Sequence, residues 1–245
     1  MTAQSYRYLL CLGIFLYSNL FLNAQAITDT VAGGPLPQFM RDQYKSRLGG
    51  SASIYNGTEY TSTYPETKGS PFFHELGFTE GSIIYDGTYY PQIPLLYDLA
   101  SASLCTKGLQ GQALRLLPSK ISRFTIDGHQ FLSISEPDKS LPEGFYDILF
   151  EKMAVSFLVS RKKVPVRGLS TEEPYHFSTY QSYFIRKDSS YTEINSKNDF
   201  LSLFPEVRKE LKKHWSDQKL DFKKEPEAAI VESLVYYYSK LKAGL

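Results

Sequence analysis

The sequence contains few of the residues that form metal centres, disulfide frameworks and redox sites. Its 245 residues include two cysteines, four histidines, three methionines and one tryptophan. Two cysteines are too few for a disulfide scaffold or a cysteine-rich zinc site. The histidines are widely separated, and His74-Glu75 lacks the second histidine that a zincin motif requires. We therefore expect no metal ion and no cofactor.

The chain also lacks an excess of charge and a long apolar run. Lysine and arginine total 27 and aspartate and glutamate total 26, so the formal net charge is +1. This balance argues against a nucleic-acid partner, which would need a basic surface. The apolar run over residues 9–22 is shorter than the roughly 20 residues of a membrane-spanning helix. Aromatic residues are abundant instead, with 19 tyrosines and 16 phenylalanines, and they exclude a disordered chain.

Residues 1–26 have the organisation of a secretory signal peptide. Arg7 is the only charged residue, the apolar run follows it, and Ala24-Gln25-Ala26 has the small-x-small pattern of a cleavage site. We predict cleavage after Ala26, with an uncleaved membrane anchor as the alternative. The mature protein would be exported to the periplasm, the outer membrane or the exterior, with no transmembrane segment. Its remaining cysteine, Cys105, is expected to be a small buried apolar residue.

Residues 51–195 carry the turn signals and the alternation of antiparallel strands. Pro91 and Pro94 predict that residues 92–97 form an edge strand or a bulged strand. No segment between the expected strands has the length and apolar pattern of a crossover helix, so a parallel sheet is not expected. Tight turns are predicted at 56–57, 86–87, 127–128, 151–154 and 187–190.

After residue 196 the apolar period changes from that of a strand to that of a helix. Ser196 or Asn198 is expected to cap a first helix, Pro205 to begin a second, and Pro226 to begin the last. The last helix has an apolar stripe made of Ile230, Leu234, Tyr237 and Leu241.

These patterns predict an α+β fold that is mostly β. We expect an antiparallel β-meander, either an open barrel or a sandwich-like sheet, with a C-terminal helical hairpin packed on it. The chain divides into a signal peptide (1–26), an N-terminal lead segment (27–50) with a short helix at 38–48, the antiparallel β region (51–195) and the C-terminal helices (196–245). The last two segments are expected to form a single domain.

No motif in the sequence identifies a catalytic residue. The nucleophile elbow G-x-S-x-G and the phosphate-binding glycine loops are absent. Asp86, Asp98, Asp127 and Asp147 lie at or near strand ends, where two carboxylates could form an acid/base pair as in glycosidases. However, Asp86 and Asp127 each precede a glycine, and the turn explains their presence. We therefore assign no catalytic residue.

Two surface features remain as candidates for binding. The tyrosines of the first strands suit half-buried sheet positions, but aromatic rings also enrich binding faces, and we take Tyr85, Tyr89, Tyr90 and Tyr97 as candidate binding residues. The basic run Arg161-Lys162-Lys163, with Arg167 beyond it, is expected to be a solvated strand end. Contact with phosphate or lipid headgroups is its alternative.

Several segments together resemble a family of uncharacterised exported proteins of Bacteroidetes-type bacteria. They are Tyr-Asn-Gly-Thr-Glu-Tyr at 55–60, Gly-Ser-Ile-Ile-Tyr-Asp-Gly at 81–87 with Tyr90, Pro-Leu-Leu-Tyr-Asp at 94–98, and the lysine-rich helix near the C-terminus. The resemblance implies export and a β-rich fold, and it supplies no activity and no catalytic residues. Where the resemblance leads us to expect glycine after Phe150, this chain has Glu-Lys-Met-Ala.

We therefore favour a non-enzymatic binding or interaction module of the cell envelope, with an envelope protein or glycan as partner. One alternative is a hydrolase of envelope sugar or peptide that uses strand-end carboxylates or His74. It requires at least two of these groups, or Glu75, to converge in one pocket. Another alternative is a carrier of a small molecule or lipid in a β-barrel cavity, which requires an apolar cavity inside the sheet.

Overall fold

The computed structural model describes residues 51–62, 64, 67–75, 77–135, 140–168 and 175–242. The predicted signal peptide, its cleavage positions Ala24 and Ala26, and the lead segment 27–50 lie outside these residues. Among the helices in the described part of the chain, none combines the length and apolar composition needed to cross a membrane.

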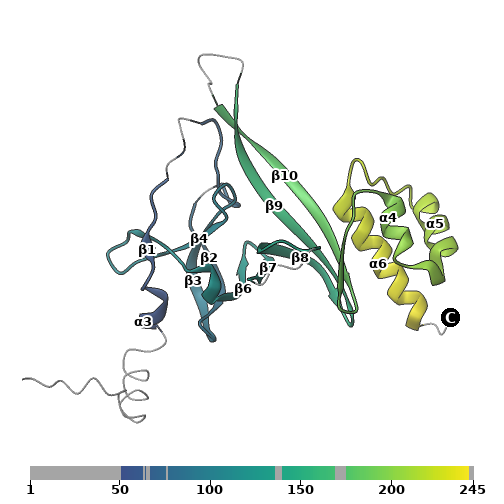
Figure 1. Ribbon diagram of the computed structural model, residues 1–245, viewed down its shortest axis with the longest axis horizontal. Helices are drawn as coiled ribbons and strands as arrows, with labels where there is room; N and C mark the ends of the chain where they lie inside the picture. Colours follow the sequence, from purple (N-terminus) through teal and green to yellow (C-terminus); the bar gives the residue numbers. More distant parts are fainter. Residues whose placement is uncertain are drawn as a thin grey trace, which may run out of the picture. The chain divides into compact units, whose positions relative to one another are not determined.

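Antiparallel strands make up most of the described chain, and helices follow them at its C-terminal end, as predicted (Figure 1). A short helix, α3 (Ser51–Ile54), precedes the first strand. The strands are β1 (Thr58–Glu59), β2 (Thr79–Tyr85), β3 (Thr88–Asp98), β4 (Ser103–Lys107), β5 (Ala113–Arg115), β6 (Ile121–Ile126), β7 (His129–Ile134), β8 (Gly144–Lys152), β9 (Val155–Arg167), β10 (Tyr175–Lys187) and β11 (Ser190–Glu193).

The sheet has the strand order β1-β5-β4-β3-β2-β6-β7-β8-β9-β10-β11. From β6 onward it is the predicted meander. In the first half of the sheet, the strands β2 to β5 follow one another toward the edge that β1 forms. The short helix η1 (Pro118–Lys120) then leads to β6, which pairs with the other side of β2. Within the described strands, β1 and β11 end the sheet and do not pair with each other. The sheet is therefore open, and the barrel cavity that a carrier would need is not formed.

The Asp-Gly turns are formed where the sequence predicts them. Asp86-Gly87 and Asp127-Gly128 have positive φ at both residues, which is the geometry of the tight hairpin turn that favours these dipeptides. Asn56-Gly57 is different, because it links α3 to β1 and closes no hairpin. Gly57 is required there for another reason: a Cβ at this position would collide with the carbonyl oxygen of Arg115.

Residues 92–97 belong to β3, which lies between β2 and β4 in the strand order. Its residues up to Leu95 pair with β2, and its residues from Leu95 to Asp98 pair with β4. The bulge that Pro91 and Pro94 predict is present. The register between β2 and β3 shifts between Gly81 and Ile83, and Gln92, on the opposing part of β3, has a positive φ. The bulge removes one residue of β3 from regular pairing, and this allows a central strand to contain prolines.

The helices cover one face of the sheet around β8, β9 and β10. They are α4 (Lys197–Ser202), the short helix η2 (Pro205–Val207), α5 (Arg208–Asp217) and α6 (Pro226–Lys242). Ser196 caps α4 by accepting a hydrogen bond from the backbone of Asp199, and Pro205 and Pro226 begin their helices as predicted. Leu241 is exposed, so the apolar stripe of α6 ends before it.

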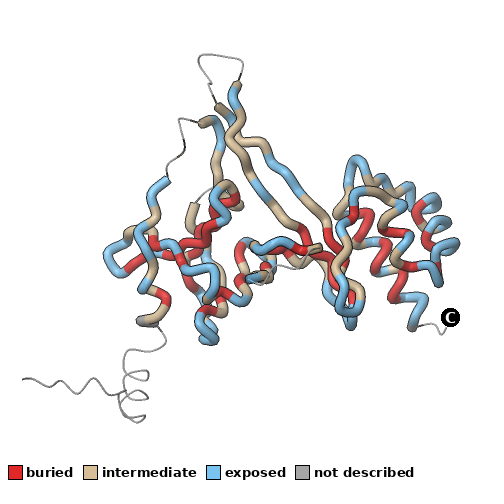
Figure 2. The backbone as a smooth tube through the Cα atoms, in the orientation of Figure 1, coloured by how far each residue is buried: buried red, intermediate tan, exposed pale blue. Residues whose placement is uncertain are grey.

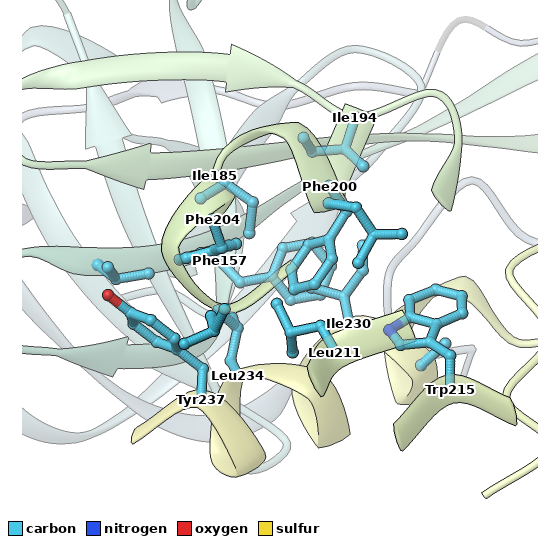
Figure 3. Close-up of a cluster of buried hydrophobic side chains, with 14 of the residues drawn as sticks. Phe157, Ile185, Ile194, Phe200, Phe204, Leu211, Trp215, Ile230, Leu234 and Tyr237 are labelled. Carbon is cyan, nitrogen blue, oxygen red and sulfur yellow. The ribbon is translucent and has the colours of Figure 1, made fainter. Parts of the chain in front are cut away.

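Two main hydrophobic cores result, and a smaller third cluster contains Leu141, Tyr146, Leu158 and Phe184. In the first, which we call the N-terminal core, rings and aliphatic side chains of β2 to β8 pack on one another, including Tyr97, Phe124, Phe131 and Phe145. In the second, which we call the helix core, the apolar faces of the helices bury the face of β9 and β10 that carries Phe157 and Ile185 (Figure 3). The main members of the helix core are Phe157, Ile185, Ile194, Phe200, Phe204, Leu211, Trp215, Ile230, Leu234 and Tyr237.

The strands β9 and β10 extend beyond both of their neighbours. They pair with each other over their full lengths, but β8 pairs with β9 only as far as Ser160, and β11 pairs with β10 only from Phe184. We call the projecting part, residues 160–167 of β9 and 175–182 of β10, the arm. Figure 2 shows that β9 and β10 are buried next to the helices and become partly or fully exposed along the arm.

Candidate functional site

The four candidate tyrosines do not share one surface. Tyr85 and Tyr97 belong to the N-terminal core and are almost completely buried, so neither ring is available to a partner. Tyr97 makes edge-to-face contacts with three phenylalanine rings of that core. Tyr90 is half-buried, and Tyr89 is 61% exposed. Tyr85 and Tyr97 are therefore not accessible as binding residues, because the face of the sheet that carries them forms the N-terminal core.

Tyr89 lines a shallow groove on the opposite face of the sheet. Its neighbours there include Ser82, Ile84, Arg123 and Gln130, and the groove has a volume of about 200 Å³. The guanidinium of Arg123 is already paired with the carboxylate of Glu151, at 3.2 and 3.4 Å. The groove therefore presents one exposed aromatic ring, that of Tyr89.

Asp98 is a structural anchor and not a free acid. It is fully buried, and its Oδ2 accepts hydrogen bonds from the hydroxyls of Tyr60 (2.8 Å), Tyr64 (2.7 Å) and Ser101 (2.6 Å). Its Oδ1 accepts from the backbone amides of Ala100 and Ser101. Burial raises the pKa of Tyr64 to about 12, so this hydroxyl remains a donor at neutral pH. The carboxylate thus holds the segment before β2 against the turn after β3.

Asp147 lies at the centre of a second polar cluster, between the two cores. Its Oδ2 accepts from Nδ1 of His129 at 2.8 Å and from Nε and Nη2 of Arg161 at 2.9 and 2.7 Å. Arg161 also donates to Glu227, with Nη1 2.7 Å from Oε1. The cluster connects β7, β8 and β9 to the first turn of α6. The hydrogen bond to Asp147 raises the pKa of His129, which favours the doubly protonated ring.

A histidine paired with a carboxylate can act as a general base when a nucleophile lies beside it. Among the described residues no serine, threonine or cysteine side chain hydrogen-bonds to His129. Arg161 neutralises the same carboxylate oxygen, and Asp147 is 1% exposed. We therefore interpret the cluster as a polar link between the sheet and the helices.

The other candidate acids are separate from these two. Asp86 pairs with Lys120 at 2.9 Å and accepts from Ser53, and His74 faces Asp127 at 3.9 Å. A pocket of about 420 Å³, next to β7 and β8, is lined by none of these groups. Within the described ranges, no three histidine, cysteine or carboxylate side chains are placed to hold a metal ion. Cys105 is buried, and burial raises the pKa of its thiol to about 12.

The outer edge of β10 is the feature that the sequence reasoning missed. Alternate residues of a strand direct their backbone groups to opposite sides. On β10 the amide of Phe177 donates outward to Lys68, and the carbonyl of Tyr183 accepts from Ile194 of the chain after β11. Thr179 and Gln181 share this alternation, so their N–H and C=O groups also point outward. In the described chain these four groups have no backbone partner.

The opposite edge of the arm is protected. On β9 the amide of Lys163 donates to the carbonyl of Leu99, and its ammonium group donates to the carbonyls of Ser70 and Phe72. Pro165 has no N–H to offer an incoming strand. Edge strands in native sheets are usually blocked by such prolines, charges or covering segments. On β10, residues 177–185 contain no charge and no proline, and within the described chain no segment pairs with the edge between Phe177 and Tyr183.

No protein-family model, curated protein or solved structure matches this chain. Its function is therefore inferred from its own geometry.

Proposed function

We propose that this chain is an exported, non-enzymatic binding module of the cell envelope that binds a partner protein through the open edge of β10. The observation that carries the proposal is the pair of outward-facing backbone units at Thr179 and Gln181. Exposed edges of this kind bind extended peptides by adding a strand, with main-chain hydrogen bonds supplying affinity. Export is supported by the signal-peptide pattern of residues 1–26 and by the resemblance to exported proteins.

The two alternatives have less support. A hydrolase would need converging acid/base groups, whereas Asp86, Asp98 and Asp147 lie in three different clusters, each with its own hydrogen-bond partners. A carrier would need a closed apolar cavity, whereas the described sheet is open. A glycan partner is retained for one reason only, which is the exposed Tyr89 beside its shallow groove.

Site-specific photocrosslinking in cells that export the protein tests this proposal. A photoreactive residue is placed at Thr179 on the open edge, at Tyr89 in the groove, or at Met153, which is 81% exposed in the β8–β9 turn and serves as control. We expect a discrete protein adduct from Thr179 and none from Met153. The same adducts from Thr179 and from the control Met153 would overturn the proposal. A glycan adduct from Tyr89, with no adduct from Thr179, would also overturn it.

A further inference from the structure

We infer that the partner inserts a short, extended and acidic segment into the gap on the β10 edge. The inference rests on the proposed function and specifies the occupant. It is argued from the length of the gap, from what the flanking segments exclude, and from the charges beside it.

The gap is five residues long. On one side Lys68 occupies the edge, because its backbone bonds to Tyr175 and Phe177. On the other side β11 occupies the edge from Phe184 onward. Residues 178–182 lie between them, which corresponds to about 17 Å of strand. An incoming strand must therefore be short, and its chain must leave the plane of the sheet at both ends.

A second copy of the molecule does not satisfy this condition. Residues 178–182 read Ser-Thr-Tyr-Gln-Ser and are uncharged, so two copies could in principle pair antiparallel about Tyr180. Beyond residue 182, however, each β10 carries its own β11 on the same edge. In such a pair, β11 of one copy would occupy the space that β10 of the other copy needs. The flanking strands therefore exclude a symmetric dimer through this edge.

The backbone groups of the gap define the register of the occupant. Thr179 and Gln181 together offer two donors and two acceptors, enough for four main-chain hydrogen bonds to an extended segment. Tyr180, between them, projects its ring from one face of the sheet and is 55% exposed. The incoming residue opposite Tyr180 places its side chain on that same face, and so do the residues two positions before and after it.

The face that carries Tyr180 contains an exposed cation, Lys162. Lys162 lies directly across from Tyr180 on β9, is exposed, and has no acidic partner among the described residues. His176 lies on the same face of β10, four residues from Tyr180, and is exposed. Arg167, near the tip, is exposed as well, but it is paired with Tyr175 and projects from the opposite face. The described parts of β9 and β10 contain no aspartate or glutamate.

The two basic residues that flank Lys162 on β9 already have partners. Arg161 binds Asp147 and Glu227, and Lys163 binds backbone carbonyls. Lys162 is therefore the cation left to meet a partner at the centre of the gap. Acidic side chains at alternate positions of the incoming strand would face Lys162 across the ring of Tyr180, since cross-strand pairs of opposite charge stabilise a sheet. The two outer acidic positions lie beside Ser178 and Ser182.

Binding of synthetic peptides to the purified full chain tests the inference. Three peptides share a flexible flank and a five-residue core in which valine alternates with glutamate, glutamine or lysine. We expect the glutamate peptide to bind about three- to tenfold more tightly than the glutamine peptide, and the lysine peptide to bind most weakly. This preference should decrease at high salt. Amide exchange should slow at Thr179 and Gln181 in the presence of the glutamate peptide.

Two pairs of variants locate the effect. Lys162→Glu should abolish or reverse the preference for glutamate, whereas Lys209→Glu, an exposed position on α5, should leave it unchanged. Thr179→Pro removes one outward N–H and should weaken all binding, by about two- to tenfold, whereas Thr179→Val keeps that N–H and should not. Lys162→Glu retains every backbone group, so it tests the inference even if the proline variant folds poorly.

The outcomes separate the inference from the proposed function. Equal binding of all three peptides, with loss in Thr179→Pro, would keep the binding edge and overturn the acidic partner. A protein adduct at Thr179 without binding of any peptide would overturn the short acidic strand alone. Absence of both would overturn the inference and the proposed function together. A concentration-dependent dimer that Thr179→Pro abolishes would identify a second copy as the occupant and overturn the inference.

Discussion

The base and the arm of the β9–β10 hairpin belong to one continuous ladder but have opposite surroundings. At the base, Phe157 and Ile185 are completely buried beneath the helices (Figure 3). In the arm no helix covers the strands, and residues 179–181 are exposed (Figure 2). The pairing of the strands is the same in both places, so coverage and not hydrogen bonding decides their role. The base stabilises the fold, and the arm offers an unpaired edge.

The arm is held by polar contacts in place of a core. Asp98 accepts hydrogen bonds from the hydroxyls of Tyr60 and Tyr64. The ring of Tyr64 packs edge-on against that of Phe177 on β10, with the ring centroids 5.5 Å apart. Lys163 binds the carbonyls of Ser70 and Phe72. These bonds position the arm without covering the outer edge of β10. An edge can therefore be held in place and still remain available to a partner.

The largest contrast between base and arm should appear in a core truncation. Phe157→Ala leaves a cavity beneath the helices and should lower the free energy of unfolding by about 4 kcal/mol. Tyr180→Ala removes an exposed ring in the arm and should change it by no more than about 0.5 kcal/mol. Denaturant unfolding of both variants measures the difference. Equal losses would show that the arm contributes to the core, and the contrast would fail.

A second test lies at the boundary, where Arg161 joins the sheet to α6. Arg161→Met leaves the buried carboxylate of Asp147 with His129 as its remaining charged partner among the described residues, and should cost about 3 kcal/mol of unfolding free energy. The neighbouring variant Lys162→Met removes an exposed charge and should cost less than about 0.5 kcal/mol. Adding Asp147→Asn to Arg161→Met should recover part of the loss, since it removes the buried carboxylate charge that Arg161 neutralised. A loss from Lys162→Met as large as that from Arg161→Met would contradict this assignment.

The same cluster should make stability depend on pH. The hydrogen bond to Asp147 raises the folded-state pKa of His129 above its unfolded value of about 6.5. The resulting stabilisation is complete below that unfolded value and is lost as the pH rises through the folded-state pKa. Unfolding free energies measured between pH 6 and 8 should therefore fall for the natural chain, and fall less for His129→Gln. His176→Gln, in the arm, is the control and should keep the full decrease.

The smallest expected effect compares two adjacent positions of β10. Thr179→Pro removes an N–H that points outward and has no partner in the described chain, so it should cost less than about 1 kcal/mol. Ser178→Pro removes an N–H that points toward β9 and should cost roughly 1–3 kcal/mol more, since the opposing carbonyl then loses its bond. Thermal or denaturant unfolding distinguishes them. Equal costs would mean that the edge of β10 is not open.

Local chemistry made much of the fold predictable from the sequence. Asp86-Gly87 and Asp127-Gly128 adopt positive φ, which few other dipeptides accept, and they mark their hairpins directly. Ser196, Pro205 and Pro226 begin their helices through capping and through a fixed φ, both of which act within a few residues. Asn56-Gly57 shows the limit, because its glycine is required by contact with distant Arg115 and not by a hairpin.

The candidate site was only partly visible in the sequence. Residues 177–185 lack charge and proline, which is the composition of an unprotected strand. That composition is equally compatible with a central strand, and only the lengths of β8 and β11 show where pairing stops. The sequence did not show that Tyr85 and Tyr97 are buried, for a related reason. Alternation shows which residues share a face, but the curling of the sheet decides which face is buried.

The sequence by itself determined the class of this protein: antiparallel strands with their tight turns, followed by capped helices with apolar stripes, because each signal acts over a few neighbouring residues. Only the tertiary structure decided that β6 returns to β2, that the helices cover the base of β9 and β10, and that five residues of the β10 edge have no paired strand within the described chain. Those features depend on which distant segments meet, and no local pattern encodes the end of a neighbouring strand.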